Sequence, residues 1–185
     1  MDEWKIGDPV DWGDGWMDAQ NWGHGDDEMN PDNIDSTQYC QRDEYSRKAW
    51  DCYLDSNYDD ALRYIDLALD LDRTHPNNWN IKGIIYDAMG IYGKSEECFN
   101  RSLDLAPSSV VSDNKARMLK RCTEFIFQLS KDLPNHSYLL DVALERNMDA
   151  INALPKSNSK ENLDDYLAQR DKIKNYIMQR DSQNR

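Results

Sequence analysis

Residues 77–107 read NNWNIKGIIYDAMGIYGKSEECFNRSLDLAP, and this stretch decides the fold class. Trp79, Gly83 and Tyr86 follow one another at intervals of four and three residues, so they share one face of a helix. Gly90 interrupts this spacing. A second stripe with helical spacing then consists of Ser95, Phe99, Ser102 and Leu103. The stretch therefore predicts two helices that fold back on each other as a helical hairpin.

The residues before this stretch repeat it with an offset of 34 positions. Tyr45 corresponds to Trp79, and Ala49 corresponds to Gly83. The further correspondences pair Ser56, Tyr58, Ala61, Ile65 and Ala68 with Gly90, Tyr92, Ser95, Phe99 and Ser102. Small residues match small ones and bulky residues match bulky ones. This pattern is typical of two helices that approach closely at small side chains and fill the space beside them with large ones.

A 34-residue period with this content resembles the tetratricopeptide repeat (TPR) family, whose motif is Trp-x-x-Leu-Gly-x-x-Tyr followed by Ala, Phe, Ala and Pro. The second copy departs from the motif in having Lys82 at the leucine place and serines at both alanine places, and the first copy has Arg73 at the proline place. The resemblance implies an all-α fold, a right-handed TPR-type solenoid of helical hairpins.

A third, lengthened hairpin is expected after Pro107. The 34-residue period fails on its packing side, because Arg117 and Lys120 take the places of Gly83 and Tyr86. The spacing of the second helix nevertheless returns with an offset of 48, at Ala143, Asn147, Ala150 and Pro155. Since the excess is 14 residues, we expect both helices of this pair to be longer by about two turns each.

The last helix is expected from Lys160 to about Arg180, with a capping pair formed by Asn158 and Glu161 and a frayed end after Arg180. Its apolar face consists of Leu163, Tyr166, Leu167, Ile173, Tyr176 and Ile177. A terminal helix of this kind covers the open end of a repeat stack. Pairing of two chains into a homodimer through the same face is the alternative.

Three parts follow from these patterns: an acidic N-terminal segment at 1–34, helical repeats at 35–155, and a C-terminal capping helix with a frayed end at 156–185.

The chain has a net charge of −13, and residues 1–35 supply −10 of it, with eleven acidic residues against one lysine. An acidic chain is repelled by nucleic acid and by anionic lipid, so we expect neither as a partner. Without an apolar run of about 18 residues or a leader sequence, we expect a cytoplasmic protein.

Residues 1–34 also hold four of the six tryptophans, namely Trp4, Trp12, Trp16 and Trp22. Four interpretations remain open for this segment. It could be a solvated tail, a linear motif that binds a partner, a segment that occupies the protein's own groove, or an oxygen-ligand site for calcium. The spacing of its aspartates does not fit a calcium loop, which makes the last interpretation weak.

Catalysis is not expected. The three histidines lie in separate segments, the four cysteines show no paired spacing, and neither a phosphate loop nor a catalytic motif is present. We therefore expect no enzyme activity, no metal and no cofactor, and we expect the cysteines to be reduced, packed thiols.

A groove is the better candidate site, because in the TPR family the first helix of each pair lines the concave side. The period places these residues there: Trp50, Tyr53, Asn77, Asn80, Ile84, Asp87, Asn114, Met118 and Arg121, with Asp43, Ser46, Leu54, Ala88, Val111 and Cys122 beside them. Trp50, Tyr53, Ile84 and Met118 are expected as apolar anchors, and Asn80 as a clasp for a peptide backbone. The alternative is that the N-terminal segment or the last helix fills these positions.

The expected function is that of an adaptor or scaffold that binds a partner polypeptide in this groove. Two alternatives stay open: the N-terminal segment is the partner-binding or autoinhibitory motif, or the protein is a chaperone of secreted or assembling proteins. The subfamily that clamps the C-terminal carboxylate of heat-shock chaperones has Lys, Asn and Arg at places that hold Ser46, Trp50, Ile81, Val111 and Lys115 here. That particular function is therefore not implied.

Overall fold

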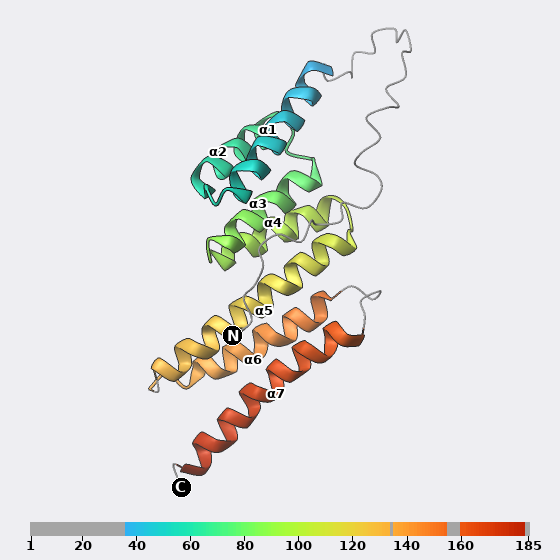
Figure 1. Cartoon of the computed structure of the whole chain (residues 1–185). Helices are drawn as coiled ribbons and strands as arrows, with labels where there is room; N and C mark the ends of the chain where they lie inside the picture. Colours follow the sequence, from blue (N-terminus) through green and yellow to red (C-terminus); the bar gives the residue numbers. More distant parts are fainter. Residues whose placement is uncertain (1–35, 134, 155–159, 184–185) are drawn as a thin grey trace. The chain divides into compact units, whose positions relative to one another are not determined.

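The computed structural model describes residues 36–133, 135–154 and 160–183, which contain seven helices and no strand (Figure 1). The expectation of an all-α fold is confirmed. The helices are α1 Ser36–Leu54, α2 Tyr58–Leu71, α3 Pro76–Ala88, α4 Tyr92–Leu105, α5 Ser109–Asp132, α6 Tyr138–Ala153 and α7 Lys160–Gln183. The interpretations of the tryptophans and aspartates in 1–34, and the capping pair of Asn158 with Glu161, lie outside the described residues or their described side chains.

Consecutive helices pack as hairpins, α1 with α2, α3 with α4, and α5 with α6, and α7 then packs on α6. The hairpins are joined in turn, because α3 contacts both α1 and α2, and α5 contacts both α3 and α4. The hydrophobic core follows this order. One buried cluster joins α1, α2 and α3 around Ile65 and Ile85, and the next joins α4 to α5, α6 and α7 around Phe99 and Leu119.

The turns of the first two hairpins have the same backbone geometry. Gly90 has φ +73°, and Ser56, which lies 34 residues earlier, has φ +59°. The next residue donates a backbone hydrogen bond five positions back in both turns, from Asn57 to Cys52 at 2.8 Å and from Ile91 to Tyr86 at 2.9 Å. This is the hydrogen bond of a Schellman cap, which requires a left-handed residue after the helix.

The stripe of small residues lets α3 and α4 approach closely, as the sequence predicts. A Cβ atom added to Gly83 would lie 2.7 Å from the Phe99 ring. The serines at the alanine places of the motif also bond across this contact. The Ser95 hydroxyl donates to the Gly83 carbonyl at 2.8 Å, and the Ser102 hydroxyl donates to the Pro76 carbonyl at 2.8 Å. Each serine thus satisfies its own buried oxygen and ties the two helices together.

The extra length of the third hairpin is not shared between its two helices. α5 has 24 residues against the 13 of α3, whereas α6 has 16 against the 14 of α4. The expectation of two extra turns in each helix is therefore wrong. The reason lies in what covers the extension: Phe127 of α5 is buried among Leu140 and Ala143 of α6 and Ile173 of α7. Because two helices cover it, the long end of α5 needs no equally long partner.

α7 has its apolar face buried as predicted, with Tyr166 and Ile173 in the core. Polar contacts fix its register. The Gln169 amide donates to the Lys120 carbonyl at 3.1 Å, and Asn147 of α6 donates to Gln169 at 3.1 Å. The helix runs to Gln183, three residues beyond the expected end at about Arg180. Fraying of its end stays a prediction. Whether α7 also pairs two chains stays a prediction.

Candidate functional site

The first helices of successive hairpins are held in register by side-chain pairs. The Asn114 amide donates to Asn80 Oδ1 at 3.1 Å. Arg121 Nε donates to Asp87 Oδ1 at 3.1 Å, and its Nη2 bonds to the other oxygen of the same carboxylate. Both pairs join residues 34 positions apart, so the period that fails on the packing side of α5 persists on this side.

We call this surface the ladder face and define it by the residues that the sequence analysis selected: Trp50, Tyr53, Asn77, Asn80, Ile84, Asp87, Asn114, Met118 and Arg121. The contacts of α3 with both α1 and α5 place the three helices that carry them next to one another. The sequence thus correctly predicts which positions of α3 and α5 adjoin. Their role in binding stays a prediction.

The aromatic end of the ladder face lies on α1. The rings of Trp50 and Tyr53 have centroids 4.9 Å apart, and Tyr53 also lies 6.2 Å from Tyr58 of α2. Both α1 rings are half-buried against the core cluster of Ala61 and Ile65. Burial raises the pKa of Tyr53 above its usual value. These side chains are therefore held by packing and still expose part of their surface.

Two of the expected binding residues are not accessible. Met118 is 0% exposed, because α5 packs on α4 as well as on α3 and the methionine enters the core cluster that contains Phe99. Asn80 is 2% exposed, and its side-chain oxygen accepts the hydrogen bond from Asn114. The expectations of Met118 as an anchor and of Asn80 as a backbone clasp are therefore wrong. Ile84 is half-buried beside the same cluster.

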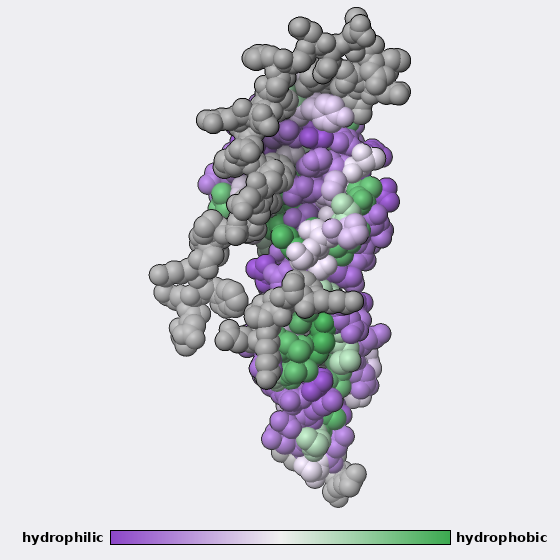
Figure 2. All heavy atoms as spheres, turned by 90° about the vertical axis from the view of Figure 1, so that its right-hand side faces the viewer, coloured by the Kyte–Doolittle hydropathy of each residue, from purple (hydrophilic) through white to green (hydrophobic). Residues whose placement is uncertain are grey.

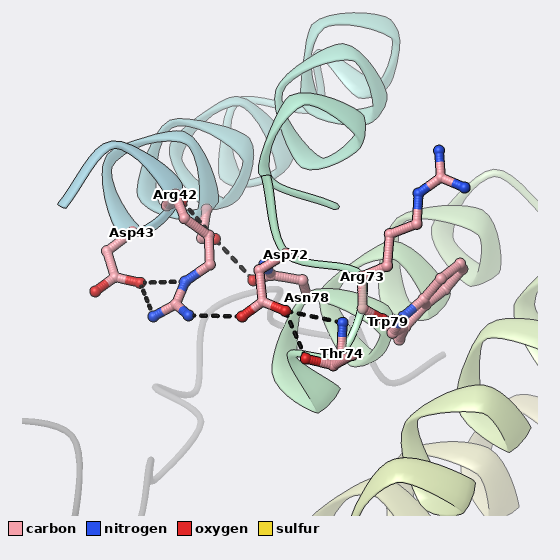
Figure 3. A network of polar contacts seen from close by, with 8 residues as sticks. Arg42, Asp43, Asp72, Arg73, Thr74, Asn78 and Trp79 are labelled. Carbon is pink, nitrogen blue, oxygen red and sulfur yellow. Dashed lines mark hydrogen bonds and ion pairs between the residues drawn. The ribbon is translucent and has the colours of Figure 1, made fainter. Parts of the chain in front are cut away.

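The start of α3 carries a polar network that the sequence did not predict (Figure 3). Arg42 of α1 donates to Asp72 at 2.9 Å, and the backbone N–H and hydroxyl of Thr74 donate to the other oxygen of Asp72 at 2.9 and 2.7 Å. Burial acts to raise the pKa of Asp72, but these hydrogen bonds lower it overall. The network holds the loop between α2 and α3 against α1.

A second contact at this end joins α1 to α3 directly. The Ser46 hydroxyl donates to Asn78 Oδ1 at 2.7 Å. In the loop just before α3, burial and the nearby Arg42 lower the pKa of His75. Asn77, which the sequence placed in the groove, is half-buried here. No sequence motif predicts this network. Arg42 and Asp72 lie 30 positions apart, and charged residues on helices are usually interpreted as solvent-exposed.

The charge on the ladder face is unevenly exposed. The side chain of Arg121 is 52% exposed, whereas that of its partner Asp87 is 8% exposed. Arg117 of α5 bonds to Asp113, and their side chains are 54% and 26% exposed. The sequence analysis treated Arg117 only as a break in the packing pattern. The structure places it one helical turn from Arg121, on the same side of α5.

Hydrophobic surface by itself does not distinguish the ladder face. Figure 2 shows hydrophobic side chains gathered into a patch in the lower half of the picture, with hydrophilic surface below it. Phe125 of α5 and Tyr138 of α6 are also well exposed. What distinguishes the ladder face is that three helices adjoin, with an aromatic pair on α1 and two arginines on α5.

The described residues contain no group of three or more side chains suited to a metal ion. The four cysteines are free thiols. Burial raises the pKa of the Cys98 thiol to about 11, which disfavours a nucleophilic thiolate. Cys40 is exposed, so the expectation of packed thiols is wrong at this position.

Within the described ranges, no helix combines the length and apolar character needed to cross a bilayer. Comparison of the sequence with protein-family models gives no match, and comparison with curated proteins gives none either.

Proposed function

We propose that this protein is a non-enzymatic adaptor of the tetratricopeptide-repeat type, and that it binds a partner polypeptide on the ladder face. The observation that supports the proposal is the pair of side-chain contacts at a spacing of 34 residues, Asn80 with Asn114 and Asp87 with Arg121. These contacts align equivalent positions of α3 and α5. A row of equivalent positions suits an extended chain, because successive residues of that chain then meet similar surroundings.

Packing prepares the aromatic end of this face for binding. Trp50 and Tyr53 contact each other and the core behind them, so little side-chain freedom is left for a partner to remove. Tryptophan, tyrosine and arginine are the residues that most often dominate interface energies. All three lie on the ladder face.

The test is a binding measurement on a partner recovered from the native cell. Calorimetry with the purified partner is expected to show at least about tenfold weaker binding for Trp50→Ala and for Ile84→Asp. Tyr64→Ala is the matched control, because Tyr64 is a half-buried aromatic residue of α2 that stacks on Tyr45 away from the ladder face. Circular dichroism must show that each variant is folded. Equal affinities for all four proteins would remove the ladder face from the mechanism.

A second candidate is the N-terminal segment, which is favoured by its four tryptophans among acidic residues. A chain that begins at Ile34 separates the two proposals. If the ladder face is the binding element, this shorter chain keeps its affinity for the partner. Loss of binding would favour the segment, and tighter binding would favour autoinhibition by it.

A further inference from the structure

The two arginines on α5 present positive charge although each is paired with a carboxylate. The carboxylates of Asp87 and Asp113 are much less exposed than the guanidinium groups that cover them. A ligand that approaches the ladder face here meets Arg117 and Arg121 first. Electrostatic complementarity at an interface depends on the charge that is accessible, so this end of the face suits a negatively charged partner.

Both guanidinium groups keep unused hydrogen-bond donors. Arg121 bonds to Asp87 through Nε and Nη2, and Arg117 bonds to Asp113 and Asn114 through Nη2. Within the described part of the chain, neither Nη1 makes a hydrogen bond. A guanidinium has five N–H donors in a planar arrangement, and a carboxylate is the group that fits two of them at once.

The surroundings favour a peptide over a simple anion. Burial lowers the pKa of Arg121, while the nearby phenols of Tyr53 on α1 and Tyr166 on α7 act to raise it. The Trp50 ring contacts Tyr53. An acidic chain with apolar side chains can use both the arginines and the aromatic rings. A polyphosphate chain has no apolar side chain to place against these rings.

α5 is also the helix to which an acidic ligand would be drawn. It carries five basic residues against three acidic ones, whereas α2 carries four acidic residues against one basic residue. Attraction toward α5 would draw an acidic chain to the ladder face rather than to α2.

We infer that the polypeptide bound on the ladder face is an acidic segment, with carboxylates on Arg117 and Arg121 and an apolar side chain against Trp50 and Tyr53. This inference rests on the proposed function and specifies the chemistry of the partner.

The experiment is a selection against the full-length chain with displayed random peptides of twelve residues. The enriched peptides are expected to contain more Asp and Glu than the starting library. One of them is then synthesised with a fluorescent label, together with a copy in which Gln replaces Glu and Asn replaces Asp. Fluorescence anisotropy is expected to show at least about tenfold weaker binding for the uncharged copy, and the difference should shrink with added salt.

Variants of the protein locate the effect. Arg117→Gln together with Arg121→Gln is expected to weaken binding of the acidic peptide at least about tenfold and to leave binding of the uncharged copy nearly unchanged. Since Arg121→Gln strands a buried carboxylate, Asp87→Asn with Arg121→Gln is the second variant, which keeps a hydrogen-bonding pair without charge. Arg63→Gln is the control, because this exposed arginine of α2 pairs with Asp60 away from the face.

The outcomes separate the two proposals. Enriched peptides that are not acidic, but that lose affinity for Trp50→Ala, overturn this inference and leave the proposed function standing. If no peptide is enriched, both fail. An acidic peptide whose affinity is unchanged by the arginine variants overturns the inference, and so does a labelled twelve-nucleotide RNA that binds more tightly than the peptide.

Discussion

The hairpins α1–α2 and α3–α4 differ from α5–α6 in dimensions but not in the alignment of their first helices. The first two share a turn geometry at Ser56 and Gly90 and a 34-residue spacing of their packing residues. In the third, α5 is 24 residues long, yet Asn114 and Arg121 still meet their counterparts 34 residues earlier. The comparison shows that the 34-residue register between α3 and α5 is kept on the ladder face, whereas the far end of a hairpin can be lengthened when another helix covers it.

The largest expected effect concerns the joint between the regular hairpins and the third one. Phe99→Ala removes a fully buried ring from the cluster that joins α4 to α5 and is expected to lower the free energy of unfolding by about 3–5 kcal/mol. Phe125→Ala, at a position that is 58% exposed, is the matched control and should cost less than about 1 kcal/mol. Urea unfolding measures both. If Phe125→Ala lowers the free energy of unfolding more than Phe99→Ala does, the packing of α4 on α5 does not depend on Phe99.

Gly83→Ala tests the close approach of α3 and α4. The added Cβ would lie 2.7 Å from Phe99, so we expect a loss of about 1–3 kcal/mol in the free energy of unfolding. Gly93→Ala makes the same change in α4 where nothing lies within 4 Å, and helix propensity predicts a gain of up to about 1 kcal/mol. Thermal or urea unfolding of the two variants should give effects of opposite sign. Equal signs would mean that the glycine stripe does not set the helix spacing.

Reciprocal substitutions at the two turns test whether they are equivalent. Gly90→Ala places a Cβ at φ +73° and should cost about 1 kcal/mol, while Ser56→Gly relieves the same conformation in the first turn and should stabilise by up to about 1 kcal/mol. Both values come from unfolding midpoints at constant denaturant slope. If Ser56→Gly destabilises the protein, the Ser56 side chain stabilises the first turn, and the two turns are not equivalent.

The smallest expected effect is a pH dependence of the unfolding free energy that arises from His75, in the loop between the first two hairpins. Burial lowers the pKa of His75 in the folded protein, so the unfolded chain binds a proton more readily. Stability from this group is fully present above the ordinary histidine pKa of about 6.5 and is lost as the pH falls toward the lowered folded value. The decline in unfolding free energy from pH 7.5 to 5.5 should be shallower in His75→Asn. An unchanged slope would show that His75 is not responsible.

The sequence was most informative where local rules decide the structure. The pairing of Gly83 with Phe99 and of Ala49 with Ile65 in a 34-residue unit correctly predicted α1 to α4, because small and bulky residues at helical spacing permit few other packings. The same period correctly placed Asn80 beside Asn114.

Where distant elements decide, the sequence was less informative. Nothing in the spacing shows which helix of the third pair takes the extra 14 residues, because the answer depends on cover from Ile173 in α7. Met118 was misplaced because its burial depends on Phe99 of the preceding helix. Arg42 and Asp72 belong to no sequence motif, and they meet only because folding brings α1 next to the loop after α2. The sequence therefore did not predict their contact.

The contacts Asn80–Asn114 and Asp87–Arg121 have a consequence for how the protein can grow. Each contact is defined by a fixed distance along the chain and by two neighbouring hairpins, without reference to either end of the molecule. A duplicated 34-residue module inserted after Pro107 would present to α5 the same partners that α3 presents now. Gene duplication would therefore extend the ladder face one module at a time, while the terminal helices keep their present packing.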